Sequence, residues 1–392
     1  MKFSFPVIFL LLWLLPQISP AQSEALLDSI ELHNTTLAAL RMNTTAAMAG
    51  NRSELRLSDP EAEVGYLFGT PKGIPNRVNL SVTQPLDWGV LTGRKRSLAR
   101  AADRVAHASY AVQRQSILAE ASRLLTMAVY YNRLCAELAL RTETADELRA
   151  ACEEKFAQGD LNQMELNKVK LNATVAQAAL QRARAERAGV RADLQKLNGG
   201  RPIVCNDTTY TDNPLPALAD LLRHVEERHA LVDASKAAVA QSEEQLRVAR
   251  TENWPTLNVG FAGEYIKGNN YSGLTLGMSI PLWGNSRAKL KQRRAETVAE
   301  QLSLADVQAQ LTADVRREYA DALSLFNTAA QLDAQIAATA NAGLLARALE
   351  EGQLSLLDYL PELSFYYEAR TAQLEAERDA QLAAASLRSY LR

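Results

Sequence analysis

The stretch Phe156-Ala157-Gln158-Gly159-Asp160-Leu161 decides the fold, because it is one glycine-centred break in a long run that otherwise predicts helix. No proline occurs from Leu86 to Arg201, and Ala, Leu, Arg, Glu and Gln dominate this run. Helices are therefore predicted over 90–155 and 161–197. At about 1.5 Å per residue the first would be roughly 100 Å long. The stretch is therefore predicted to be the tip of a long helical hairpin, with Gly159 allowing the reversal.

A second break, Leu349-Glu350-Glu351-Gly352-Gln353-Leu354, has a similar setting. Its glycine follows Gly159 by 193 residues. Helices are predicted on either side of it, over 285–349 and 354–390. The sequence thus predicts a second hairpin tip at Gly352.

Four short stretches alternate between apolar and polar or small residues, which predicts strands. They are 63–70, 77–84, 256–266 and 273–280. One apolar and one polar face is the pattern of a strand that lies between lipid and water. Four strands are too few to close a barrel, and open edges are not tolerated in lipid. Three protomers would supply twelve strands, so we expect a trimeric barrel.

The strands end in matching corners, Pro85-Leu86-Asp87-Trp88-Gly89 and Pro281-Leu282-Trp283-Gly284. The tryptophans of the corners precede the tip glycines by 71 and 69 residues. This match predicts an internal duplication in which each copy reads helix, two strands, long hairpin. The predicted class is mainly α with membrane β. The predicted divisions are a first repeat at 22–200, a linker at 201–216 and a second repeat at 217–392.

The N-terminus predicts a secretory signal peptide over 1–21. Lys2 precedes the apolar run Phe3–Leu15, and Ser19-Pro20-Ala21 offers small residues at a cleavage site. A short N-terminal anchor is the alternative. The formal net charge is −2, which gives no argument for binding nucleic acid.

No catalytic set is visible, so we expect neither an enzyme nor a cofactor or metal site. The four histidines are scattered, and His224 and His229 are five residues apart rather than the four that suit zinc on a helix. Cys135, Cys152 and Cys205 are an odd number for an exported chain. They are interpreted as packing residues, with a redox or metal role as the alternative.

This order of elements resembles the TolC family of outer-membrane efflux channels, particularly its metal- and cation-efflux branch. Several loose motifs carry the resemblance over nearly the whole mature chain. They are Asn34-Thr35-Thr36-Leu37 (without the family's proline), Asp59-Pro60-Glu61 before Gly65-Tyr66, Pro255-Thr256-Leu257, the Phe156–Leu166 tip, and Leu194-x-x-Leu197-Asn198-Gly199-Gly200.

The resemblance implies a homotrimer with a twelve-stranded barrel in the outer membrane of a Gram-negative bacterium and a helical tunnel through the periplasm. It implies a passive duct that docks to a periplasmic membrane-fusion adaptor and an inner-membrane efflux pump of the RND type. Two other classes stay open. One is a periplasmic coiled-coil adaptor or scaffold, and the other is a secreted structural coiled coil.

Three groups of residues are candidate sites. The tips are expected to contact the adaptor, through Gly159, Asp160, Leu161, Gly352, Gln353 and Leu354. A carboxylate stands six residues after each tip glycine, Glu165 and Asp358. The resemblance implies that Asp358 lines a closed periplasmic gate, although Pro361 replaces the family's second acidic position. Together with Glu165, a trimer would then present up to six carboxylates, so both are candidate gate residues. Ordinary exposed helix carboxylates are the alternative.

The corners form the third group. They are expected at the membrane interface through Pro85, Trp88, Pro281 and Trp283, because tryptophan favours that interface. Basic residues follow both corners, beginning at Arg94 and Arg287. They are interpreted either as a solvated helix surface or as contacts with lipid headgroups.

Overall fold

The computed structural model describes residues 20–392 except 54, 211–213, 252–253, 280–285 and 340–341. Most of the predicted signal peptide, with Pro281 and Trp283 of the second corner, therefore lies outside the described residues. The helices are α1 (Pro20–His33), α2 (Thr35–Ser53), α3 (Trp88–Leu91), α4 (Arg94–Gln158), α5 (Gln163–Leu197), α6 (Leu218–Arg228), α7 (Ala230–Thr251), α8 (Ser286–Ala338), α9 (Ala342–Glu350) and α10 (Leu356–Ser389). The strands are β1 (Glu61–Leu67), β2 (Arg77–Leu86), β3 (Thr256–Ile266) and β4 (Asn269–Ser279).

The chain forms two compact units, each built from several segments. Of the described residues, the first contains those up to Ala38, with Arg114–His224 and Ala313–Arg392. The second contains Ala39–Gln113 and Val225–Thr312, and so holds all four strands.

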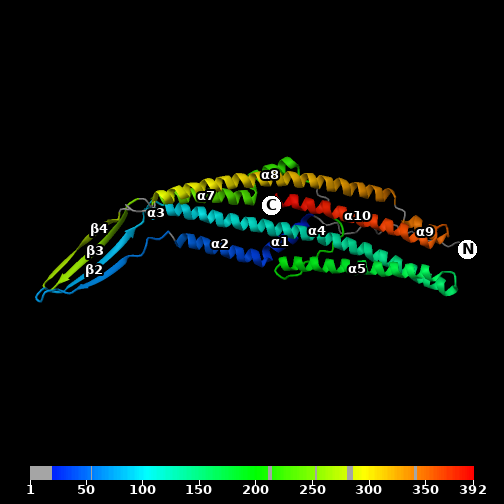
Figure 1. Cartoon of the computed structure of the whole chain (residues 1–392), viewed down its shortest axis with the longest axis horizontal. Helices are drawn as coiled ribbons and strands as arrows, with labels where there is room; N and C mark the ends of the chain where they lie inside the picture. The colour runs from blue at the N-terminus through cyan, green and yellow to red at the C-terminus, as the bar shows by residue number, and fades with distance from the viewer. Residues whose placement is uncertain (1–19, 54, 211–213, 252–253, 280–285, 340–341) are drawn as a thin grey trace. The chain divides into compact units, whose positions relative to one another are not determined.

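The strands form one antiparallel sheet in the order β1-β2-β3-β4, which Figure 1 labels in part. The central pairing joins β2 to β3, so hairpins from the two halves of the sequence share a sheet. In this register Val82 lies opposite Phe261, and Phe261 lies opposite Leu274. Directly opposite residues lie on the same face of a sheet, so the apolar faces of the strands coincide.

The predicted strands are confirmed, with shifts at their ends. β3 has the predicted bounds, whereas β1 lies about two residues earlier than predicted. The expectation that Pro85 ends its strand is wrong, because Pro85 pairs with Asn258 inside β2. Pairing with β1 ends at Thr83, so Pro85 has no β1 neighbour to which an N–H would have to donate.

The turn between β3 and β4 is shorter than predicted. Lys267 and Gly268 form it, and Gly268 has φ +95°. Asn269 and Asn270, which the sequence assigned to the turn, already pair within the sheet with Ile266 and Tyr265.

The long first helix is confirmed, but it begins later than predicted. A short α3 precedes it, and Gly93, at φ +71°, separates the two. α4 then runs for 65 residues, which is about 98 Å at helical rise.

Asn34 separates α1 from α2. Asn34 is 4% exposed, and its Oδ1 accepts from the Leu37 N–H at 2.9 Å. Its Nδ2 donates to the Leu197 carbonyl at the end of α5, at 2.8 Å. A Cβ on Gly199 would stand 2.3 Å from the His33 carbonyl oxygen, so that position accepts only glycine.

The sequence missed a second break, at His229 between α6 and α7. His229 is 8% exposed, and its Nδ1 accepts from the Leu231 N–H at 3.3 Å. The side chain thus caps the start of α7, where the first N–H groups have no acceptor within the helix. The predicted helix 285–349 is likewise divided into α8 and α9, with residues 340–341 between them not described.

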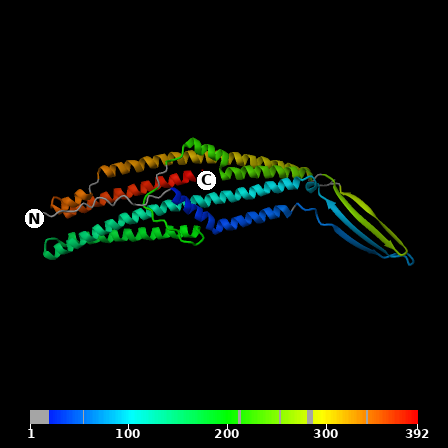
Figure 2. The same cartoon turned by 180° about the vertical axis from the view of Figure 1, so that it is seen from behind.

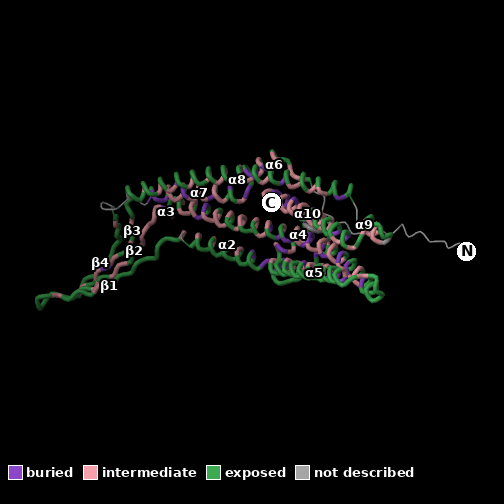
Figure 3. The backbone as a smooth tube through the Cα atoms, turned by 45° about the vertical axis from the view of Figure 1, so that its right-hand side comes forward, coloured by how far each residue is buried: buried purple, intermediate pink, exposed green. Residues whose placement is uncertain are grey.

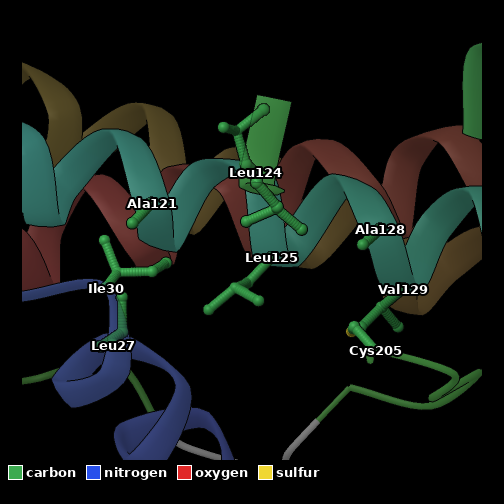
Figure 4. Close-up of a cluster of buried hydrophobic side chains, with 9 residues drawn as sticks. Leu27, Ile30, Ala121, Leu124, Leu125, Ala128, Val129 and Cys205 are labelled. Carbon is green, nitrogen blue, oxygen red and sulfur yellow. The ribbon is translucent and has the colours of Figure 1, made fainter. Parts of the chain in front are cut away.

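The first unit has its own hydrophobic core. Side chains from α1, α4, α5 and the segment after α5 meet there (Figure 4). The buried members are Leu27, Ile30, Ala121, Leu124, Leu125, Ala128, Val129, Leu194 and Cys205. Coiled-coil-like spacing along α4 predicts such packing.

The C-terminal part of α4 lies between α5 and α10 in both views (Figures 1 and 2). Charged groups tie α4 to α10, since Arg133 pairs with Glu377 at 2.5 Å. The guanidinium of Arg378 lies 4.8 Å from the centre of the Tyr130 ring, within the range of a cation–π contact. The helices of this unit are therefore held by polar contacts at their edges as well as by apolar packing.

Candidate functional site

The first hairpin tip is a helix ending closed by a glycine. Gly159 has φ +85°, and its N–H donates to the Phe156 carbonyl at 3.1 Å. The N–H of Asp160 donates to the Lys155 carbonyl at 2.9 Å. This is the hydrogen bonding that satisfies the last carbonyls of a helix when a left-handed residue ends it. The predicted role of Gly159 in the reversal is confirmed.

The start of α5 is fixed by a capping box. Asn162 is the N-cap, and its Oδ1 accepts from the Glu165 N–H at 2.9 Å. The Glu165 carboxylate in turn accepts from the Asn162 N–H at 3.1 Å. Leu161 and Leu166 occupy the flanking positions of a hydrophobic staple and belong to one cluster. Glu165 therefore has a structural function at this site.

The second tip repeats this arrangement. Gly352 has φ +69°, and the N–H of Gln353 donates to the Ala348 carbonyl at 2.8 Å. Ser355 is the N-cap of α10 and accepts from the Asp358 N–H at 3.2 Å. The Ser355 hydroxyl donates to the Asp358 carboxylate at 2.6 Å.

The two candidate gate carboxylates thus hold the same position, the third residue of the helix after each tip. The sequence contains the signal, since Asn162-x-x-Glu165 and Ser355-x-x-Asp358 are both capping patterns. Capping by itself explains why the two carboxylates have the same spacing from the tip glycines. The spacing is therefore not evidence for a gate. The proposed gate role of Glu165 and Asp358 stays a prediction.

A hydrophobic cluster connects the first tip to the start of α10. Cys152, Leu166 and Val169 are its buried members, and Leu356 and Leu360 pack against them. The two tips therefore lie close to each other in the first unit.

Only part of each tip is open to solvent. Asp160 and Gln353 are exposed, as the sequence predicted, together with both glycines. Leu161 and Leu354 are half-buried rather than freely exposed. Leu161 packs against the cluster below it, because a staple residue anchors the chain entering the helix. Contacts with a partner at these tips would therefore involve the polar residues more than the leucines.

The sheet presents a continuous apolar face that no described part of the chain buries. No strand residue belongs to the buried hydrophobic set of the described chain. In Figure 3 the strands are mainly green and pink, whereas purple marks the helices. Leu274 is 87% exposed and Leu276 is 77% exposed. The face also includes Val64, Tyr66, Val78, Leu80, Val82, Leu257, Val259, Phe261, Tyr265 and Met278.

The opposite face of the sheet is mostly polar or small. Thr83, Gly260 and Thr275 lie side by side across three strands. A Cβ on Gly260 would stand 2.5 Å from the Val82 carbonyl oxygen, so the close approach requires glycine. Arg77 and Glu264 form an ion pair on this face at 2.7 Å.

The first corner joins the sheet to the helices through aromatic contacts. The Trp88 Nε1–H donates to the Pro255 carbonyl at 2.6 Å. The Trp88 ring meets Trp254 edge to face at 5.8 Å, and Trp254 is 50% exposed. The sequence did not predict this pairing. An exposed indole at the end of an apolar face suits a membrane interface.

The three cysteines are free and buried. Burial, with Asp207 beside it, raises the pKa of the Cys205 thiol to about 11. Burial also raises the pKa of Cys152. A thiol that stays protonated is a poor nucleophile and a poor metal ligand, which favours the packing interpretation.

The described residues offer no grouping of three His, Cys, Asp or Glu side chains that would hold a metal ion. None of the described helices combines the length and apolar character that crossing a membrane requires.

Comparison with known proteins finds a family match for part of the chain. Residues 221–391 match the model of the outer membrane efflux protein family. No curated protein matches the chain in sequence. This C-terminal part of the chain is therefore similar to outer membrane efflux proteins.

Solved structures share the fold over nearly the whole chain. The CmeC outer membrane channel of Campylobacter jejuni superposes with a TM-score of 0.78 at 14% identity, covering 94% of this chain and 85% of CmeC. A membrane protein from Pseudomonas aeruginosa gives 0.76 at 18% identity, covering 95% and 94%. The open state of the Neisseria gonorrhoeae MtrE channel gives 0.74 at 19% identity, covering 94% and 88%.

At these identities the likeness concerns the fold. It extends to the first half of the chain, which the family model does not match. CusC is also similar, with a TM-score of 0.69 at 15% identity. These scores do not separate branches of the family, so the predicted metal- and cation-efflux branch stays a prediction.

Proposed function

We propose that this protein is the outer-membrane duct of an efflux system. The observation that carries the proposal is the uncovered apolar face of the sheet, on a chain whose fold matches outer membrane channels. From Leu257 to Tyr265, β3 advances about 26 Å at 3.3 Å per residue. That length matches the apolar band of roughly 25 Å on membrane strands. Aromatic residues stand toward both ends, Trp254 at one and Tyr265 at the other.

The duct is a homotrimer in this proposal. β1 and β4 are the edges of the sheet within one chain, and their unpaired backbone groups require partners in lipid. Three copies would close a barrel of twelve strands with the apolar face toward outer-membrane lipid and the polar face toward water. The matched corners and tips of the two halves support the further proposal that each protomer is an internal duplication.

The test is to insert the purified full-length protein into planar lipid bilayers and to measure single-channel conductance. We expect discrete conductance steps, together with a trimer on gels that dissociates only on heating. An oligomer that associates with membranes but never conducts would contradict the duct. A soluble monomer would instead favour the adaptor or scaffold alternative.

The exposed tips, in this proposal, contact a periplasmic membrane-fusion adaptor that links the duct to an inner-membrane pump of the RND type. Gly159 and Gly352 both have open space where a Cβ would stand, although their positive φ disfavours any other residue. The exposed Asp160 and Gln353 are therefore the better residues to alter. Exchanging each for tryptophan is expected to abolish efflux in cells while leaving the heat-modifiable trimer intact. Loss of the trimer would mean that these residues serve assembly.

Glu165 and Asp358 are proposed to form a ring of up to six carboxylates at the periplasmic entrance of the trimer. Such a ring attracts cations, so divalent cations should block conductance. Glu165→Gln and Asp358→Asn keep an oxygen acceptor for capping while removing the charge. We expect both substitutions to weaken the block. Unchanged block with a normal unfolding midpoint would leave these residues with capping alone.

A further inference from the structure

We propose that a pocket at the base of the sheet binds a phosphate-bearing anion. The pocket belongs to the second unit and has a volume of about 300 Å³. It lies between the α3–α4 corner and the C-terminal end of α7. Its lining is Thr92, Arg94, Arg247, Arg250, Thr251 and Trp254. The described lining residues thus contribute three guanidinium groups and no carboxylate.

Two of the three arginines keep their charge available. Arg247 pairs with Glu244 at 2.6 Å, which neutralises one positive charge. Within the described part of the chain, no carboxylate pairs with Arg94 or Arg250. Guanidinium groups bind phosphate oxygens through paired N–H donors, and two of them facing one cavity would suit a single phosphate.

The start of α4 adds to the positive potential. Arg94 is the first residue of a helix of 65 residues, and the first turn contains no acidic residue. Gly93 precedes it and has no side chain to cap the first N–H groups, which lack acceptors within the helix. Basic residues at this end oppose the helix dipole, so a bound anion would relieve an unfavourable arrangement.

The threonines shape the pocket rather than donate to its ligand. The Thr92 hydroxyl donates to the Trp88 carbonyl at 2.6 Å, and the Thr251 hydroxyl donates to the Val248 carbonyl at 2.7 Å. Both hydroxyl protons are thus already used in hydrogen bonds to backbone carbonyls. The arginines, with the first N–H groups of α4, are left as the donors for an anion.

The position of the pocket suggests where the phosphate comes from. Trp254 lines it and also contacts Trp88 at the end of the apolar face. An aromatic pair at that level suits the boundary between lipid tails and headgroups. The headgroup of an anionic lipid offers a phosphate at that depth, and a free phosphate offers the same chemistry. The anion chemistry itself does not depend on the proposed duct.

The test compares Arg94→Gln/Arg250→Gln with the control Arg100→Gln/Arg104→Gln. The control removes the same charge from exposed positions of α4 that do not line the pocket. Native mass spectrometry of the full-length protein in nonionic detergent measures binding of phosphatidylglycerol, with phosphatidylcholine as the zwitterionic comparison. Inorganic phosphate is titrated in a separate arm. Far-UV circular dichroism checks that both variants fold.

We expect phosphatidylglycerol to bind the wild type and the control equally, and the pocket variant about tenfold more weakly. Binding of phosphatidylglycerol without inorganic phosphate assigns the pocket to a headgroup, and binding of both assigns it to phosphate in general. An equal loss in both variants would reduce the effect to general surface charge and overturn the proposal. So would a failure of both ligands to bind the folded wild type. None of these measurements requires conductance. A failure of the anion-binding proposal is therefore distinguishable from a failure of the proposed duct function.

Discussion

Leu194 and Leu276 are the same residue in opposite surroundings. Leu194 is 1% exposed in the helical core of the first unit, whereas Leu276 is 77% exposed on the sheet of the second. The helices bury their apolar side chains against one another, so that unit carries its own core. The described chain leaves the apolar face of the sheet uncovered, and an apolar face of that extent marks a surface that meets lipid or another protein.

This difference shows that apolar residues in this protein lie in two different environments. In the helical unit they are removed from water within the chain itself, which stabilises the fold. On the sheet they would gain from burial only when something outside the protomer covers them. The following changes test that contrast.

The largest effect is expected from truncation in the core. Leu194→Ala should lower the free energy of unfolding by about 2–5 kcal/mol, because it leaves a cavity in packed surroundings. Leu276→Ala removes the same atoms from an exposed site and should change it by about 0.5 kcal/mol or less. Urea unfolding in detergent measures both. A loss at Leu276 equal to that at Leu194 would mean that the sheet face is packed after all.

A charge placed on each face of the sheet gives the next effect. Leu276→Arg should destabilise the protein in a membrane by about 2–4 kcal/mol, since arginine on a lipid-facing strand position is disfavoured. Thr275→Arg places the same charge on the opposite face and should be tolerated. The fraction of protein recovered in outer membranes distinguishes the two. Equal recovery of both variants would contradict a lipid-facing apolar side.

The smallest effect concerns the caps at the two tips. Asn162→Ala removes the acceptor for the Glu165 N–H, and Ser355→Ala removes the acceptor for the Asp358 N–H. Each should lower the free energy of unfolding by about 1 kcal/mol. The loss is smaller than at Leu194, because water can replace the lost acceptor at an exposed helix end. Thermal unfolding midpoints of the two variants measure it, with Gln353→Ala as the control at an exposed tip residue. If neither substitution lowered the unfolding midpoint, the structural explanation for the paired carboxylates would be wrong.

Much of this fold is predictable because its signals are local. The alternation in 256–266 predicts β3 with its observed bounds, and the glycines at 159 and 352 predict the two reversals. The breaks at Gly93 and His229 were missed, since each depends on a conformation or a side-chain acceptor that periodicity does not reveal. Pro85 was misassigned for a related reason. A proline fits inside β2 only because β1 stops short of it, and the length of a neighbouring strand is not a local property.

The candidate sites divide in the same way. The spacing of Glu165 and Asp358 from their glycines was visible in the sequence, and their shared hydrogen bonding at helix starts gave that spacing a structural cause. The corner was predicted from Trp88, but its aromatic partner Trp254 was not, because 166 positions separate them.

The sequence by itself determined where the chain is helical, where it alternates, and where it reverses, because periodicity and glycine act over a few residues. Only the tertiary structure decided that β2 pairs with β3, and that pairing aligns the apolar side chains of both hairpins on one face. It also brought Arg94 and Arg250 to a single pocket. The physical reason is that register and packing bring together residues far apart in the chain, and such contacts leave no local trace in the sequence.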